Sequence, residues 1–389
     1  MLPLLLLLAA AATLVPQLAA AQSGGGFSTR AKAAVLLDAD TGAILYQNNA
    51  DELLPPASVS KLMTAAVVFR ALKEGRIKLT DEFTMSEHAW RTGGAPSRTS
   101  SMFVPINTPA TIDELLKGLI IQSGNDAAIC LAEGLGGTEE QFAKRMTVEA
   151  RRIGLSKSTF ANPHGLYDPG QLMTAREIGM LAHYIIREYP EYYPIFSQRL
   201  FEYRKHKFFN RNPLLPLDIG ADGLKTGYVK ESGYNLVGST VQGGKRLIVV
   251  VMGLATEADR VAEAKKLIDW GYRSFAPFKL FNAGETVGSA RVWGGEKFYV
   301  PLTGGDGPIT VILPRVPENP RLKAEIIYKG PLKPPVKKGT KVAVLRVTSV
   351  GTNSVNEVPL YAAEDVEPGG LMRRGLDSLA HLAISWVRL

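Results

Sequence analysis

Apolar residues recur along the chain with two different spacings, and the change between them divides the sequence. Near the N-terminus, residues 33–37 and 43–47 flank Asp40-Thr41-Gly42, a pattern that predicts a β-hairpin. Residues 87–103 are polar and are predicted to form a loop. Helical periodicity predicts a helix over residues 58–73 that is apolar nearly all round and ends before Gly75. Four more helical stretches are predicted at 112–121, 124–134, 139–153 and 174–188.

Strands follow these helices. Residues 223–228 are predicted to form a strand, and 234–241 can pair with 245–252 across a Gln-Gly-Gly turn. Residues 259–273 have the spacing of an amphipathic helix. Because the strands are connected by turns, the sheet is expected to be antiparallel and the fold class α+β.

The pattern changes again from Pro277 onward. Short alternating runs at 309–312, 341–347 and 354–360 are separated by Pro and Gly, and long helical stretches are absent from the sequence pattern. This alternation predicts a second, all-β domain. The length of 389 residues suits two domains.

The two ends differ from the rest. Residues 2–21 carry no charge and end in Ala19-Ala20-Ala21 after Pro16, which predicts a signal peptide over 1–21. An uncleaved anchor helix is the alternative, and the short apolar run and two prolines count against it. At the other end, one apolar stripe predicts an amphipathic helix that lies in a membrane interface or packs on its own domain; it consists of Met372, Leu376, Leu379, Ala383 and Trp386.

We therefore expect four segments: a signal peptide (1–21), an α+β domain (22–275), a β-rich domain (276–369) and an amphipathic anchor helix (370–389). The formal charge of +8 favours an anionic membrane surface or cell-wall polymer as a partner. We find no nucleic-acid-binding motif and expect no nucleic acid. Cys130 is the single cysteine and lies in an apolar stretch, so we expect a buried, inert thiol and no internal disulfide.

Three short motifs carry candidate chemistry. Ser58-Val59-Ser60-Lys61 begins the first helix, where a spacing of three places Lys61 beside Ser58. A serine needs a base to attack a carbonyl, and burial with a nearby cation can keep a lysine neutral for that role. The N–H groups at the start of this helix point toward developing negative charge. Taken alone, Ser58 could equally be an ordinary helix N-cap.

The other two motifs lie further along the chain. Ser123-Gly124-Asn125 begins another helix, with a hydroxyl that can carry a proton and an amide that can bind a substrate amide. Lys225-Thr226-Gly227 lies on a strand, with a cation and a hydroxyl suited to a carboxylate and a glycine that permits close approach. Taken alone, Ser123-Gly124-Asn125 could equally be a helix-capping turn. Taken alone, Lys225 could equally be a solvent-facing lysine on an edge strand.

Together and in this order, the motifs resemble those of penicillin-binding proteins and class A β-lactamases. The chain is similar over nearly its whole mature length to the low-molecular-mass D-alanyl-D-alanine carboxypeptidases, the penicillin-binding protein 5 type of peptidase family S11. Matching stretches include 56–58, 122–126, 162–166 and 233–237. The resemblance implies a β-lactamase/transpeptidase-like domain, an antiparallel sheet with helices on both faces, followed by a small all-β domain and the amphipathic helix.

The resemblance also implies roles. Ser58 attacks the bond between the two terminal D-alanines of a peptidoglycan stem peptide, Lys61 takes its proton, and Ser123 returns a proton to the leaving D-alanine. Asn125 holds the substrate amide. Lys225 and Thr226 are expected to bind the terminal carboxylate, with Arg260 as a helping cation. Gly227 is expected to lie beside the substrate. The backbone N–H groups of Ser58 and Tyr228 are expected to form the oxyanion hole. Many relatives have His where this chain has Tyr228; His164 is expected to be structural.

The resemblance implies acylation of Ser58 by β-lactam antibiotics, no metal and no cofactor, and a location on the periplasmic face of the cytoplasmic membrane. A β-lactamase would require a carboxylate that activates water, commonly with S-D-N where this chain has S-G-N. A D,D-endopeptidase stays open as a close variant. The intact set of motifs argues against a non-enzymatic wall-binding protein. The lack of an H-E-x-x-H motif argues against a metallopeptidase.

Overall fold

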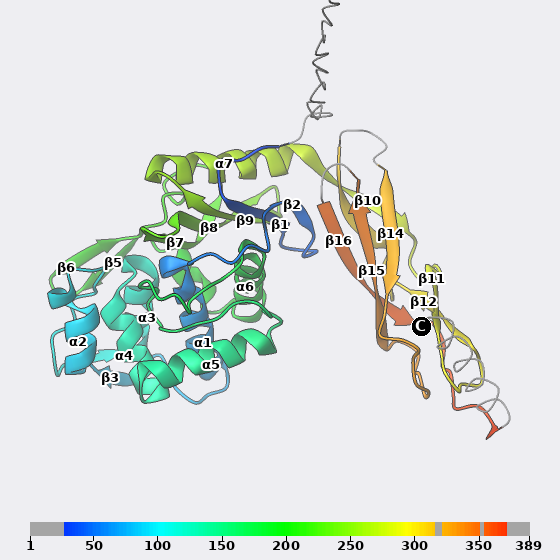
Figure 1. The fold of residues 1–389 in the computed structure, drawn as a ribbon, viewed down its shortest axis with the longest axis horizontal. Helices are drawn as coiled ribbons and strands as arrows, with labels where there is room; N and C mark the ends of the chain where they lie inside the picture. Colours follow the sequence, from blue (N-terminus) through cyan, green and yellow to red (C-terminus); the bar gives the residue numbers. More distant parts are fainter. Residues whose placement is uncertain (1–26, 316–320, 351–353, 372–389) are drawn as a thin grey trace, which may run out of the picture.

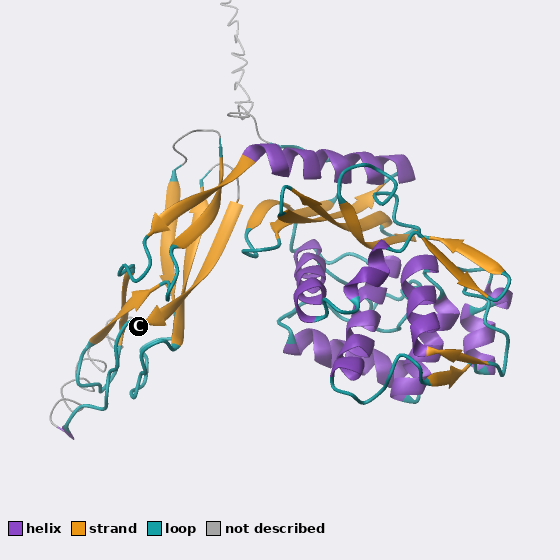
Figure 2. Cartoon of the chain, turned by 180° about the vertical axis from the view of Figure 1, so that it is seen from behind, coloured by secondary structure: helices purple, strands orange, loops and turns teal. Residues whose placement is uncertain are grey.

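The computed structural model describes residues 27–315, 321–350 and 354–371. The predicted signal peptide and the apolar stripe from Met372 to Trp386 lie outside these residues. The chain forms two parts, one of mixed helices and strands and one of strands alone (Figures 1 and 2). None of the helices in the described ranges is long and apolar enough to cross a membrane.

The first part is built on an antiparallel sheet with the strand order β2-β1-β9-β8-β7. The predicted hairpin is confirmed, and Gly42 makes its turn with a φ of 73°. The three later strands are also confirmed, with Gly243 and Gly244 between the second and the third. The bounds are β1 Ala33–Asp38, β2 Ile44–Asn48, β7 Ala221–Val229, β8 Gly233–Gln242 and β9 Lys245–Leu254.

Helices cover both faces of this sheet (Figure 1). Helix α7 (Glu257–Ser274) packs on β8 and β9 from one side, and α6 (Ala175–Glu188) packs on β1 and β9 from the other. On the same side of the sheet as α6 lie further helices near the predicted positions: α1 Lys61–Lys73, α3 Ile112–Lys117 continued by a π-helical turn Gly118–Gln122, α4 Asn125–Gly136 and α5 Glu139–Arg152.

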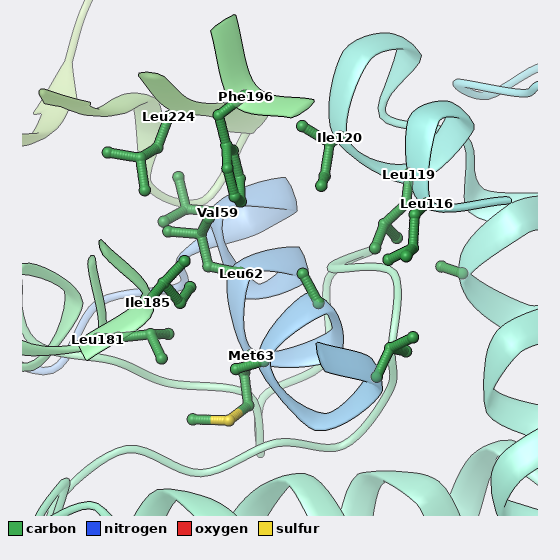
Figure 3. Close-up of a cluster of buried hydrophobic side chains, with 14 of the residues drawn as sticks. Val59, Leu62, Met63, Leu116, Leu119, Ile120, Leu181, Ile185, Phe196 and Leu224 are labelled. Atoms are coloured by element: carbon green, nitrogen blue, oxygen red, sulfur yellow. The ribbon is translucent and has the colours of Figure 1, made fainter. Parts of the chain in front are cut away.

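Helix α1 lies at the centre of the helical layer, as its apolar sequence requires. Leu62 and Met63 are buried among side chains from α6, the π-helical turn and β7 (Figure 3). Burying one such side chain contributes about 1.5–3 kcal/mol to folding. The helix that carries the first motif is therefore fixed on nearly every side by the core.

The prediction of an unbroken loop over residues 87–103 was wrong. Residues Glu87–Gly93 form helix α2, followed by a 3-10 turn at Ala95–Ser97. The Ser86 side chain caps the helix by accepting from the N–H of Ala89 at 2.9 Å, and Ala89 is buried. A cap and one buried contact are enough for a short helix that no long apolar periodicity announces.

The second part confirms the expected all-β domain. Its core is a separate apolar cluster that includes Val300, Val311, Leu345 and Leu360. It contacts the first sheet through the pairing of Val355 with Ile44. The strands are β10 Phe275–Phe281, β11 Gly288–Arg291, β12 Tyr299–Thr303, β13 Ile309–Pro314, β14 Leu322–Ile327, β15 Lys341–Ser349 and β16 Ser354–Ala362.

Two small two-stranded sheets and one further turn complete the first part. Strands β3 (Glu82–Thr84) and β4 (Pro109–Thr111) pair with each other, as do β5 (Leu200–Tyr203) and β6 (His206–Phe209). A 3-10 turn at Tyr193–Ser197 precedes β5. The segment after β6 brings the backbone N–H of Arg211 to the carbonyl of Ile121 in the π-helical turn, at 3.3 Å.

Candidate active site

The three sequence motifs meet at one cavity of ≈ 490 Å³. The first helix, the start of α4 and strand β7 approach one another there, although their motifs are far apart in the chain. The cavity is lined by Ser58, Ser100, Ser123, Arg211, Thr226, Gly227, Tyr228, Tyr234, Glu257 and Arg260.

Ser58 and Lys61 are brought together by a 3-10 turn. Residues Ala57–Ser60 form this turn and α1 begins only at Lys61, which corrects the predicted helix start at residue 58. In a 3-10 turn, side chains three residues apart eclipse each other, and Nζ of Lys61 lies 3.1 Å from Oγ of Ser58. The N-cap position is occupied by Pro56, so the Ser58 hydroxyl is not used to cap the helix.

Lys61 is about 1% exposed, which is unusual for a lysine. Its amine also contacts Oδ1 of Asn125 at 2.7 Å and the backbone carbonyl of His164. Burial, followed by the charges of Lys225 and Arg211, lowers the pKa of Lys61 well below its ordinary value. Both causes disfavour the ammonium form, so the arrangement can supply a neutral amine beside a serine hydroxyl.

Ser123 lies at the junction between the π-helical turn and α4. Its backbone is left-handed, with a φ of 63°, and Gly124 rather than Ser123 occupies the N-cap of α4. Its buried Oγ has no hydrogen-bond partner among the described residues. Because buried hydroxyls are almost always satisfied, an unpaired one at the wall of a cavity indicates a ligand or solvent partner.

Asn125 is held by the segment before α3. Its Nδ2 donates to Oγ1 of Thr99 at 2.9 Å, and its backbone N–H donates to the carbonyl of Ser100 at 2.7 Å. The same segment is tied down by Asp126, which accepts from the hydroxyl of Ser101 at 2.8 Å. The region predicted as a loop thus fixes the amide oxygen that faces Lys61.

Strand β7 supplies the third side of the cavity. It is the end strand of the sheet, but Lys225 is 2% and Thr226 7% exposed, so this lysine does not face bulk solvent. Burial, with Arg211 and Arg260 nearby, lowers the pKa of Lys225 to about 7. A lysine in this state becomes fully cationic when an anion arrives beside it.

Gly227 is required by packing within the protein. A Cβ at this position would meet the carbonyl oxygen of Pro56 at 2.8 Å and the backbone nitrogen of Ser58 at 3.0 Å. The expected reason for this glycine was close approach of a substrate. The close approach seen in the structure is that of β7 to the turn that carries Ser58.

Tyr228 and Arg260 occupy the outer rim. The Tyr228 ring is 55% exposed and packs on Tyr234, with ring centroids 4.4 Å apart. Arg260 is buried, pairs with Glu257 at 2.5 Å, and lies over the ring of Tyr234. Its Nε finds no hydrogen-bond partner within the described part of the chain, so the cavity contains a second unpaired buried donor.

Sequence analysis missed Arg211. This residue follows β6, lines the cavity, and donates to Oγ of Ser100 at 2.6 Å. No motif of the three includes it, and an isolated arginine in a loop gives no local signal of a site. Its charge nonetheless acts on both buried lysines, lowering their pKa values.

Cys130 is buried, and burial raises its pKa to about 12, which fits the predicted inert thiol. Over the described ranges, no group of three or more His, Cys, Asp or Glu side chains is placed to hold a metal ion.

Two family models and several known proteins are similar to this chain. Residues 17–256 match the family model of D-alanyl-D-alanine carboxypeptidase, peptidase S11, and residues 275–368 match the C-terminal domain of penicillin-binding protein 5. The chain is 41% identical to D-alanyl-D-alanine carboxypeptidase DacC of Escherichia coli, over 90% of this chain and 88% of that protein.

Two solved structures extend the comparison. Penicillin-binding protein 5 from Haemophilus influenzae is 36% identical with a TM-score of 0.73, covering 88% of this chain and 99% of that one. Penicillin-binding protein D2 from Listeria monocytogenes, solved in an ampicillin-bound form, is 30% identical with a TM-score of 0.58, covering 64% of this chain and all of that one.

Proposed function

The chain belongs to the peptidase S11 family of D-alanyl-D-alanine carboxypeptidases, and from this premise we propose that Ser58 is the nucleophile of its reaction, with Lys61 as the base. The protein is a serine-type D-Ala-D-Ala carboxypeptidase of the penicillin-binding protein 5 type. The roles of individual residues rest on the geometry of the cavity. The contact between the Lys61 amine and the Ser58 hydroxyl carries the proposal.

In the first step, the proton of the Ser58 hydroxyl passes to the neutral Lys61 amine as Oγ attacks the carbonyl between the two terminal D-alanines. The carbonyl oxygen becomes an anion, for which we assign the backbone N–H groups of Ser58 and Tyr228. Lys61 becomes an ammonium, and its contacts with Asn125 and the His164 carbonyl stabilise that charge. General-base assistance of this kind contributes typically about 10²–10⁴-fold.

In the second step, the C–N bond breaks and the leaving D-alanine takes up a proton. The unpaired hydroxyl of Ser123 supports its assignment as the carrier of this proton from Lys61. Asn125 has a donor and an acceptor and is assigned to the substrate amide. Water then attacks the acyl-enzyme on Ser58 and regenerates the serine.

The terminal carboxylate of the substrate is assigned to Lys225 and Thr226, with Arg260 beside them. A cation and a hydroxyl are the groups that bind a carboxylate. The unpaired Nε of Arg260, and the charges of Arg211 and Arg260 that act on buried Lys225, support the binding of an anion at this end of the cavity. Arg211 adds charge of the same sign to this end.

β-Lactams present a carboxylate and a strained amide to the same groups, so we propose that they acylate Ser58. Among the described residues that line the cavity, Glu257 is the single carboxylate, and it is paired with Arg260. This pairing leaves it poorly suited to activate water, which supports slow loss of the β-lactam rather than β-lactamase turnover.

We assign the protein to the periplasmic face of the cytoplasmic membrane. The support is sequence-based: the uncharged segment over 2–21, and the amphipathic segment 370–389, whose stripe suits a membrane interface. The proposed partners are therefore peptidoglycan stem peptides, β-lactams and an anionic lipid surface.

The test of the residue roles is release of D-alanine from a pentapeptide stem. Wild-type protein should release one D-alanine per stem, whereas Ser58→Ala should release none while keeping the wild-type melting temperature. Release by the Ser58→Ala protein would show that another residue is the nucleophile.

A further inference from the structure

The polar partners of the Lys61 amine determine the direction of its lone pair. Oδ1 of Asn125 and the carbonyl of His164 are acceptors, whereas the Ser58 hydroxyl can donate. A neutral amine has two N–H bonds and one lone pair. If both N–H groups are used by the two acceptors, the lone pair is left to face the Ser58 proton. The carbonyl of His164 thus helps to aim the base.

The His164 side chain, on the same residue as this carbonyl, is buried and bonded to its surroundings. The ring is 6% exposed, and its Nδ1 accepts from the backbone N–H of Leu166 at 3.1 Å. Nδ1 therefore carries no hydrogen, and the hydrogen of the neutral ring is on Nε2. Burial lowers the pKa of His164, which favours this neutral form.

Nε2 of His164 lies 3.1 Å from Oε2 of Glu139, the first residue of α5. The other oxygen of the same carboxylate, Oε1, lies 2.6 Å from Nε2 of His88 on α2. Burial acts to raise the pKa of Glu139, but its contacts with His164 and His88 outweigh this and lower it, so the group is a carboxylate. One carboxylate thus connects α5, α2 and the loop that holds Lys61.

We propose that Glu139 is a positioning residue for the reaction described above: by holding the ring of His164, it fixes the His164 carbonyl and so aims the Lys61 amine at Ser58. Glu139 is absent from the residues that line the cavity, so it acts without contact to substrate. His88 has a supporting role, because it holds the second oxygen of the carboxylate. The inference rests on the proposed roles of Ser58 and Lys61.

A positioning role for Glu139 affects the acylation rate and not the affinity, whereas a general loss of structure would change both. Without Glu139, the buried His164 ring loses the carboxylate that lies 3.1 Å from its Nε2, and the loop is expected to shift. The groups assigned to the substrate carboxylate, on β7 and α7, are unchanged. We therefore expect a lower rate of acylation at nearly constant affinity, since a misplacement of about 1 Å can cost on the order of 10²-fold in rate.

The test compares four proteins: wild type, Glu139→Ala, Glu139→Gln, and Glu140→Ala as a matched control. Glu140 is the next residue, lies on the exposed side of α5, and pairs with Lys144 at 2.7 Å. Acylation by a fluorescent penicillin is followed over a range of concentrations, so that the maximal rate and the half-saturating concentration are obtained separately. Melting temperatures are measured on the same samples.

We expect Glu139→Ala to lower the maximal rate about 10- to 100-fold, with the half-saturating concentration within about twofold of wild type. Glu139→Gln keeps an acceptor oxygen and should recover part of the rate; Glu140→Ala should behave as wild type. If Glu139→Ala does not fold, a slower Glu139→Gln protein with an unchanged melting temperature supports the proposal by itself.

Two results would overturn it: wild-type rates in both Glu139 variants, or a change confined to the half-saturating concentration. Failure of the wild-type protein to be acylated at all would instead contradict the proposed function, so the two proposals can fail separately.

Discussion

The amine nitrogen of Lys61 lies 3.1 Å from the hydroxyl oxygen of Ser58, in a part of the protein where two further cations, Lys225 and Arg211, act on that amine. Repulsion between like charges would be costly in an ordinary core. Here burial, reinforced by these two charges, lowers the pKa of Lys61 and keeps the amine neutral and able to accept a proton. The cost is offset by the surrounding core, because α1 is packed on nearly all sides.

Replacing Lys61 by Arg tests the need for a neutral base. A guanidinium is effectively always protonated in proteins, so Lys61→Arg keeps the charge but cannot accept the Ser58 proton. Acylation by fluorescent penicillin should fall by about 10²-fold or more. The control is Lys73→Arg, at the exposed end of the same helix. Acylation of Lys61→Arg at the rate of the control would rule out Lys61 as the base.

The pH dependence of activity follows from the two lysines. Lys61 must be neutral, so the rate should fall as pH drops through its lowered pKa. Lys225, with a pKa of about 7, must be cationic to bind a carboxylate, so affinity should weaken as pH rises above about 7. The resulting profile of kcat/KM is bell-shaped. The decrease in kcat/KM at alkaline pH should arise from a rise in KM. It should disappear with an amidated substrate that lacks the carboxylate. If the decrease persists with that substrate, a group other than Lys225 causes it.

Removing Arg211 should move the acidic limb. Without its charge, the pKa of Lys61 rises, and more of the lysine is protonated at a given pH. The acidic limb of the acylation profile of Arg211→Ala should therefore lie at higher pH than that of wild type. Because Arg211 is exposed, the difference should shrink at high salt. Arg204→Ala, an exposed arginine in the β5–β6 turn, is the control, and an identical limb in both proteins would contradict the account.

Much of the fold could be predicted from spacing alone. The hairpin β1–β2 and the pair β8–β9 follow from apolar runs separated by glycine-containing turns, and α1 follows from an apolar pattern that only a buried helix tolerates. Helix α2 could not be predicted in this way, because it is short and depends on the Ser86 cap and one buried face.

Proximity of the candidate site residues could be predicted where a motif places them within three positions of each other. Ser58 with Lys61, Ser123 with Asn125, and Lys225 with Thr226 are such cases, and the structure brings all three pairs to one cavity or its immediate wall. Arg211 and Glu139 act across the fold from separate loops and helices. Nothing in the sequence around Arg211 or Glu139 indicates that either residue acts on Lys61. Their roles become visible only in the tertiary structure.

Deletion of residues 371–389 tests the membrane proposal. If the amphipathic stripe from Met372 to Trp386 holds the protein on the membrane, the shortened protein should appear in the soluble fraction while its acylation by penicillin is unchanged. Binding to vesicles that contain anionic lipid should fall in parallel. Unchanged sedimentation with membranes would contradict the anchor without affecting the active-site assignment.

The central claim is that Ser58 becomes covalently attached to the acyl group. Mass spectrometry of the intact protein after treatment with benzylpenicillin, followed by peptide mapping, tests it most directly. We predict one added penicilloyl group, located on the peptide that contains Ser58 and absent from Ser58→Ala. An adduct on a different residue, or an unmodified wild-type protein that is folded, would contradict the account.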